Sequence, residues 1–321
     1  MSKRIACFAL LAVAGCGGGS DGELPPAAEP AASPPLARPA AGTVLRVGDS
    51  PEGLAFDERT GLLAVGLRNP DRLALVDGAS GRVVRNVSLP ESPRHLRMAG
   101  PGGPVLVPAE RANEIVQVSL PDGKLTRTRV GRFPHDAAAA GGRIFVGDEF
   151  ADSVSVVQDG RRTRTLDAPV QPGGVVASPD GRSVAVVGVR ERALELYDAR
   201  TLRSLGKVGA GNGPTHIEAT NRGFFVVDTR GGALIELRRN PLRVHGRVAL
   251  PGAPYGLARS RVRDRFWVTL TERNQVAEVT PERVRRTFPT VRQPNSVAVD
   301  RRSGRVFVAS RTEGTLQFFD P

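Results

Sequence analysis

Three of the four histidines in this chain follow a proline by one or two positions. They occur in the segments SPRHL at 92–96, FPHDA at 133–137 and GPTHI at 213–217. A histidine can serve as a general base, a hydrogen-bonding group or a metal ligand, because its ordinary pKa lies near neutrality. The candidate ligand-binding residues at these loops and at related loops elsewhere are Arg94, His95, His135, Asp148, His216, Asp228 and Tyr255.

The prolines in front of these residues belong to an internal repeat, which organises most of the chain. Seven similar segments recur at intervals of 38 to 42 residues, each marked by one proline. Regular self-similarity of this length indicates a repeat architecture in which each unit packs on its neighbours. The prolines are Pro51, Pro93, Pro134, Pro172, Pro214, Pro254 and Pro294.

Each unit contains several short runs with the pattern of β-strands. A short apolar run follows the proline, and a second comes after a turn, as in GRIFVGD at 142–148. A third run alternates apolar and polar residues, as in RALELYD at 192–198, and most units end with an Arg-rich run such as GRVVRNVSL at 81–89. Period-two alternation between Gly, Pro, Asn and Asp predicts strands, and four strands per unit is typical of a propeller blade.

The two ends of the repeat region predict how the ring closes. The seventh unit stops after its third run, at residues 315–321, and residues 43–47 resemble the fourth run that it lacks. We therefore expect an all-β, seven-bladed β-propeller over residues 43–321, built of four-stranded antiparallel blades and closed by the strand at 43–47. Such closure would leave no open sheet edge.

The same topology predicts where the candidate residues gather. Adjacent strands in a blade are antiparallel, so the proline loops and the loops after each second run share one face of the ring. The first run of each unit lies next to the central channel, and the mouth of such a channel is a common ligand site. The candidates are therefore expected at the channel mouth on this face.

His216 has a structural interpretation beside the functional ones. Glycine occupies the equivalent position in three other units, which favours a packing position near the axis, with the imidazole bonded to a backbone carbonyl. A direct contact with a ligand is one alternative. A metal site is another, and it would require His95, His135 or His216 to converge with carboxylates on one ion. Asp148 and Asp228 have a structural alternative as turn caps paired with arginines.

Repeats with this proline segment, a VFVAS-like run (306–310) and a GTLQFFD-like run (314–320) resemble the YVTN-type, YncE-like β-propellers. FVVDT at 225–229 occupies the place of the tetrapeptide that gives the family its name. The resemblance covers residues 43–321. It implies a propeller that is commonly exported, and it implies no particular activity.

A second resemblance points to an enzyme. Glu52-Gly53 is similar to the EGP element of the SMP-30-like lactonases, and Pro294-Asn295 is similar to their PNG element. This resemblance implies that Glu52 and Asn295 bind a divalent cation, Ca²⁺ or Zn²⁺, in a metal-assisted hydrolase. The chain departs from those elements at Leu54 and Ser296, and that family has six blades.

The N-terminus resembles that of a bacterial lipoprotein. Lys3 and Arg4 precede an apolar run at 5–15 that is too short to span a bilayer as a mature helix, which predicts an export signal at 1–15. Val13-Ala14-Gly15-Cys16 resembles a lipobox, which implies lipidation of Cys16 and attachment to the membrane of the cell envelope. Residues 16–42 are rich in Pro, Ala and Gly and are expected to form a disordered or extended tether.

The overall composition sets limits on partners. The formal net charge is +12, which would favour an anionic small molecule, a peptide or a cell-wall polymer as the ligand. Both cysteines lie in the first 16 residues, so the propeller has no disulfide and no cysteine-based metal site. The expected function is a monomeric, extracytoplasmic binding module with its site at the channel mouth. The alternative is the metal-assisted hydrolase, and the export signal argues against nucleic acid as a partner.

Overall fold

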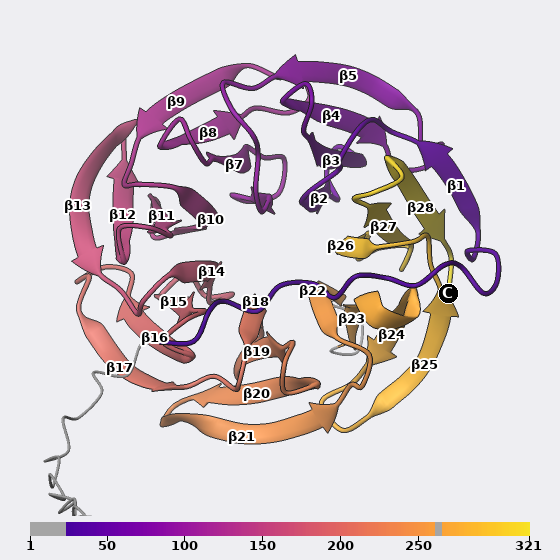
Figure 1. Ribbon diagram of the computed structural model, residues 1–321. Helices are drawn as coiled ribbons and strands as arrows, with labels where there is room; N and C mark the ends of the chain where they lie inside the picture. Colours follow the sequence, from indigo (N-terminus) through magenta and orange to yellow (C-terminus); the bar gives the residue numbers. More distant parts are fainter. Residues whose placement is uncertain (1–23, 261–264) are drawn as a thin grey trace, which may run out of the picture.

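A computed structural model describes residues 24–260 and 265–321 as a ring of seven four-stranded sheets (Figure 1). All strand pairs within the sheets are antiparallel, and one short 3₁₀ helix, η2 (Thr271–Arg273), accompanies them in the described part of the chain. The predicted all-β, seven-bladed propeller is therefore confirmed. No described helix is long and apolar enough to cross a bilayer.

Each of the first six blades takes four consecutive strands, ordered from the channel outward. Blade 1 contains β2 (Leu54–Asp57), β3 (Leu62–Leu67), β4 (Arg72–Asp77) and β5 (Val83–Ser88). Blade 2 contains β6 (Arg97–Met98), β7 (Val105–Ala109), β8 (Glu114–Val118) and β9 (Leu125–Arg129). Blade 3 contains β10 (Pro134–Ala140), β11 (Arg143–Asp148), β12 (Ser153–Gln158) and β13 (Arg161–Asp167).

The next three blades repeat this arrangement. Blade 4 contains β14 (Pro172–Ala177), β15 (Ser183–Gly188), β16 (Ala193–Asp198) and β17 (Ser204–Gly209). Blade 5 contains β18 (Pro214–Ala219), β19 (Gly223–Asp228), β20 (Ala233–Arg239) and β21 (Leu242–Ala249). Blade 6 contains β22 (Pro254–Ser260), β23 (Arg265–Leu270), β24 (Gln275–Val279) and β25 (Val284–Pro289).

Blade 7 joins the two ends of the propeller. It consists of β26 (Pro294–Val299), β27 (Val306–Ser310), β28 (Thr315–Phe319) and, as its outer strand, β1 (Thr43–Arg46). Thr43 of β1 lies opposite Phe318 and Arg46 opposite Thr315. The predicted closure by the strand at 43–47 is thus confirmed.

The core lies between blades, as the strand patterns require. Second strands such as β7 are buried along their whole length, whereas outer strands such as β13 are almost wholly exposed. One apolar cluster joins Val187 and Leu194 of blade 4 to Ile217 and Phe224 of blade 5, and similar clusters join other neighbouring blades. Because each blade buries its faces only against its neighbours, the ring is stabilised as a unit.

The residues before β1 lie on the ring. We call residues 24–42 the strap; in Figure 1 it crosses the disc from β16 past β18 and β22 to β1. Its carbonyl oxygens accept hydrogen bonds from the loops beneath, including Ala31 O from Gln293 Nε2 at 2.9 Å and Pro34 O from Asn274 Nδ2 at 2.9 Å. Residues 24–42 therefore lie along the ring, because an extended, proline-rich chain presents acceptors that polar loops can satisfy.

Candidate functional site

The ring has two distinct faces at its channel. The proline face carries the loops before each inner strand and the loops after each second strand, and the strap lies on it. The turn face carries the turns between first and second strands. The sequence placed the candidate residues at the channel mouth on the proline face.

Three histidines from three blades meet at the axis. The ring centroids of His95 and His216 are 4.4 Å apart, and those of His95 and His135 are 4.6 Å apart. Tyr255 packs edge-on against His216, with centroids 4.8 Å apart. The channel is therefore narrow enough for residues of blades 2 and 5 to touch across it. These aromatic contacts close the channel with side chains from blades 2, 3, 5 and 6.

Two of these histidines, His95 and His216, are held as uncharged imidazoles. Burial lowers the pKa of His95 well below its ordinary value, and the neighbouring histidines and arginines lower it further. Burial, followed by the charges of His135, Arg97 and Arg94, lowers the pKa of His216 to about 3. His216 Nδ1 makes no hydrogen bond within the described part of the chain. The expected bond from His216 to a backbone carbonyl is therefore not what holds this ring; aromatic packing does.

A network of ion pairs surrounds the cluster on the proline face. Arg94 lies 3.3 Å from Glu52 and 3.3 Å from Glu110, and Arg68 lies 3.2 Å from Glu110. Burial alone would lower the pKa of Arg94, but the charge of Glu52 and other nearby groups raises it. This network gives Arg94 a structural role and leaves its guanidinium fully charged.

His135 is held by a carboxylate of its own blade. Its Nδ1 lies 2.7 Å from Glu149 Oε2, and Gln171 donates to the other oxygen of Glu149 at 2.6 Å. Burial would raise the pKa of Glu149, yet the charge of His135 and its hydrogen bond lower that pKa to about 2. The start of β10 and the loop before β14 are linked through this carboxylate.

The proposed metal ligands do not form a cation site with the groups around them. Glu52 forms ion pairs with three guanidinium groups, those of Arg68, Arg94 and Arg311, so positive charge already surrounds its carboxylate. Asn295 Oδ1 accepts a hydrogen bond from Gln293 at 3.2 Å. Among the described residues, no group of three His, Cys, Asp or Glu side chains could hold a metal ion.

Asp148 and Asp228 lie within their blades, fully buried, where they cap loops. Asp148 accepts from the amide of Gly131 at 2.9 Å and from two serine hydroxyls, and burial raises its pKa to about 6. Asp228 accepts from the amides of Asn212, Gly213 and Gly231. These bonds agree with the turn-cap part of the structural alternative, and Asp228 also pairs with Arg247 at 3.5 Å. Cys16, the expected lipidation site, lies outside the described residues.

Sequence reasoning missed a second layer beneath the histidines. Arg97 of β6 lies 3.2 Å from Asp136 of β10 and 3.2 Å from Glu218 of β18, and it donates to Ile217 O at 2.8 Å. One side chain thus links blades 2, 3 and 5 across the channel. The sequence does contain an indication of this layer. Arg97, Asp136 and Glu218 are charged residues within inner runs, where a buried strand is expected to be apolar.

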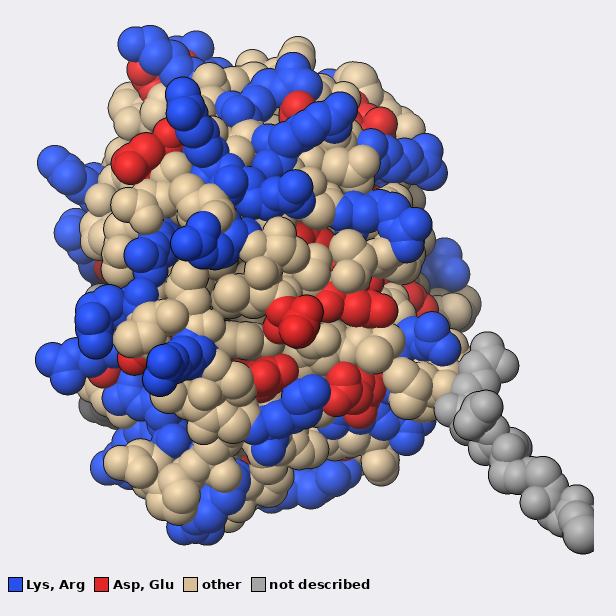
Figure 2. Space-filling model, turned by 90° about the vertical axis from the view of Figure 1, so that its left-hand side faces the viewer, with Lys and Arg blue, Asp and Glu red and all other residues tan. Residues whose placement is uncertain are grey.

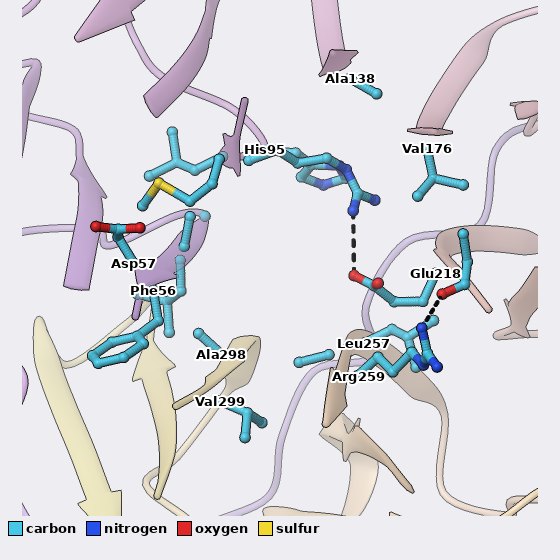
Figure 3. A pocket seen from close by; sticks show the side chains of 18 of the residues that line it. Phe56, Asp57, His95, Ala138, Val176, Glu218, Leu257, Arg259, Ala298 and Val299 are labelled. Atoms are coloured by element: carbon cyan, nitrogen blue, oxygen red, sulfur yellow. Dashed lines mark hydrogen bonds and ion pairs between the residues drawn. The ribbon is translucent and has the colours of Figure 1, made fainter. Parts of the chain in front are cut away.

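This layer forms the floor of a chamber of about 400 Å³. Figure 3 shows its apolar walls, with Ala138, Val176 and Leu257 among the labelled residues, together with the polar groups His95 and Glu218. Turns between first and second strands contribute Pro101, Pro179 and other residues to the lining, so the chamber opens on the turn face. The site with room for a ligand is therefore on the face opposite the predicted mouth.

The charges that line the chamber nearly balance. Its carboxylates are those of Asp57, Glu58, Asp136 and Glu218, and its guanidiniums are those of Arg97, Arg259 and Arg301. The net positive charge of the chain is thus not focused here. An anionic ligand gains little from this balance, which favours a ligand with little net charge.

We expect the free energy of unfolding to decrease at acid pH, in part through His216. The folded pKa of His216 is about 3 and its ordinary value is 6.5, so the unfolded chain binds the extra proton between these values. This stabilising contribution is complete above pH 6.5 and is lost as the pH falls toward about 3. Between pH 6.5 and about pH 4.5 one such histidine accounts for ~2–3 kcal/mol.

Urea unfolding of the wild type and of His216→Asn at about pH 7 and about pH 4.5 measures this contribution. The variant should lose less stability between the two pH values than the wild type, by ~2 kcal/mol. His245→Asn, in the exposed part of β21, is the matched control and should behave like the wild type. Equal acid sensitivity of His216→Asn and the wild type would show that His216 is not held neutral.

The fold resembles solved structures at low sequence identity. A streptogramin B lyase structure gives a TM-score of 0.74 at 15% identity, covering 86% of this chain and 98% of that chain. Virginiamycin B lyase from Staphylococcus aureus gives 0.72 at 12% identity, covering 85% and 97%. A chain of a mitotic checkpoint complex gives 0.75 at 12% identity, covering 100% and 99%. No family model and no curated protein matches the chain, so these likenesses show the seven-bladed propeller fold alone.

Proposed function

We propose that this protein is a binding module of the bacterial cell envelope, with its ligand site in the chamber on the turn face. The observation that carries the proposal is the chamber itself, which holds about 400 Å³ between apolar walls and a polar floor. Small-molecule sites commonly have this size and this combination of apolar walls with a few placed polar groups. The repeat pattern supports membership of the YVTN-type group as part of the same proposal.

The lining defines the chemical class of ligand. Leu257, Val176 and Ala138 favour a compact apolar body such as an aromatic ring or a branched aliphatic group. His95 and Glu218 offer hydrogen-bonding groups to a polar end that reaches the floor. A neutral small molecule, or an uncharged side chain of a peptide, fits this chamber better than the anionic ligand expected from composition.

The metal-assisted hydrolase has less support. Glu52 forms ion pairs with arginines, and the side-chain oxygen of Asn295 accepts a hydrogen bond from Gln293, so both proposed ligands already have partners among the described residues. Two of the solved structures that share this fold are lyases, which makes turnover of any bound compound worth measuring. Envelope attachment through Cys16 remains part of the proposal, on the strength of the lipobox-like sequence.

The test is a fragment screen by ligand-observed NMR, using neutral aromatic and branched aliphatic amides. Fragments that bind the wild type should lose binding to Ala177→Phe by at least about tenfold, because Ala177 lines the chamber and the larger side chain fills it. Ala249→Phe places the same change on the exposed strand β21 and should leave binding unchanged. Circular dichroism checks that both variants are folded. Fragments that bind Ala177→Phe as well as the wild type, or a wild type that binds none, would contradict the chamber as the site.

A further inference from the structure

The outer wall of blades 2 and 3 carries arginines without acidic partners. We define the basic wall as Arg129 of β9 and Arg161, Arg162 and Arg164 of β13, all of them exposed. None of them takes part in an ion pair within the described part of the chain, whereas Arg127, also in β9, pairs with Glu114, and some basic residues on other outer strands have acidic partners. Lys207 of β17, for example, lies 2.9 Å from Glu191. The basic wall therefore presents positive charge that is not held in direct ion pairs with the described residues, although the charge of Arg162 also acts on the buried Asp148.

These arginines lie on one continuous surface. The hydroxyl of Thr128 in β9 donates to Gly160 O at 3.1 Å, which holds β9 beside the turn that begins β13. Figure 2 faces this side of the ring and shows basic side chains spread over much of its upper half. Part of the net positive charge of the chain is thus displayed on the outer wall. The chamber, whose lining charges nearly balance, lies away from it.

An exposed aromatic side chain lies with an arginine on the proline face of blade 3. Phe150, in the loop between β11 and β12, is 45% exposed and packs on Phe133 with ring centroids 4.6 Å apart. Arg132, which is exposed, donates a hydrogen bond to the carbonyl oxygen of Phe150 at 2.8 Å. Aromatic rings next to arginines suit the interface between lipid headgroups and acyl chains.

The segment before β1 also connects this side of the ring to the expected lipid anchor. Arg190 of blade 4, the neighbour of blade 3, binds the carbonyl oxygen of Leu24 at 2.7 Å. Leu24 follows Cys16 by eight positions, a reach of at most about 30 Å for a fully extended chain. An acyl chain on Cys16 would therefore keep blades 3 and 4 close to the bilayer surface.

We propose that the basic wall docks on the anionic phospholipid headgroups of a membrane. The proposal rests on the envelope location in the proposed function, and it adds a second, electrostatic contact to the lipid anchor. Each arginine near an anionic membrane surface strengthens binding by roughly fivefold, so three together contribute on the order of 100-fold. A wall held against the membrane in this way leaves the turn face, with its chamber, free at the side.

The experiment uses the full chain with Cys16→Ser, which removes the acyl anchor. Sedimentation with vesicles of phosphatidylglycerol and phosphatidylcholine measures binding of this chain and of two triple variants built on it. Arg161→Gln, Arg162→Gln and Arg164→Gln together should weaken binding on the order of 100-fold. Arg243→Gln, Arg283→Gln and Arg285→Gln remove the same charge from exposed positions on blades 5 and 6 and should weaken binding much less.

The outcomes separate this proposal from the anchor. Equal losses in the two triple variants, or equal binding to pure phosphatidylcholine vesicles, would overturn the basic wall as a docking surface. Binding to dextran sulfate that depends on the basic wall, without binding to the anionic vesicles, would assign it to a soluble polyanion and overturn the membrane. Fractionation of cells that express the unmodified chain and Cys16→Ser tests the anchor separately, since its failure leaves the vesicle result unchanged.

Discussion

A chain that starts at residue 48 is expected to lose most of the stability of the propeller, whereas a chain that starts at residue 43 should remain folded. The shorter chain lacks β1, so β28 becomes an open edge in blade 7. It also loses Val47, which is buried, and Leu45, which packs on the same cluster. Burial of two such side chains contributes ~3–6 kcal/mol, and the lost strand pairing adds to this.

That loss is comparable with the whole stability of a typical domain, about 5–15 kcal/mol. Thermal and urea unfolding of the two chains, followed by circular dichroism, measure the difference. The chain starting at residue 43 is the control, because it lacks the strap but keeps the strand that closes the ring. A chain starting at residue 48 that unfolds at the same urea concentration as its control would show that β1 does not close the propeller.

The fold was predictable because its information is local and repeated. Each unit carries one proline, alternating runs and turn residues, and the ring closes because the seventh unit ends one strand short. None of these signals depends on distances across the ring. The positions of Asp148 and Asp228 in loop caps were predictable in the same way, since an Asp at the end of a strand commonly accepts backbone amides of a nearby turn.

The site was less predictable, because it depends on the width of the channel and on contacts between distant units. His95 and His216 are 121 positions apart, yet their rings touch, and no periodic pattern specifies that distance. The strap carries few large apolar side chains, so its composition indicates little packing, although its carbonyl oxygens bind Arg190 and Arg230. The chamber could not be predicted from the polar loops, because the charged residues of its floor lie within the inner strands.

Arg97 holds two carboxylates together across the channel, and its replacement by methionine is expected to destabilise the protein strongly. Asp136 is 2% exposed and Glu218 is 15% exposed, and Arg97 lies 3.2 Å from each. Removing the guanidinium leaves two acidic groups in a poorly solvated place without a cation. Breaking a buried ion pair in this way costs ~3–5 kcal/mol.

Urea unfolding at neutral pH should show this loss for Arg97→Met and a smaller one for Arg97→Lys, because lysine keeps the charge but lacks the planar group that reaches both carboxylates and Ile217 O. Arg46→Met is the matched control: Arg46 pairs with Asp49 at the surface, with side chains 69% and 57% exposed, and such pairs contribute under ~1 kcal/mol. If Arg97→Met unfolds like Arg46→Met, the cross-channel contacts do not stabilise the ring. If Arg97→Met is destabilised but Arg97→Lys is not, the positive charge alone holds the two carboxylates, and the forked geometry of the guanidinium contributes nothing further.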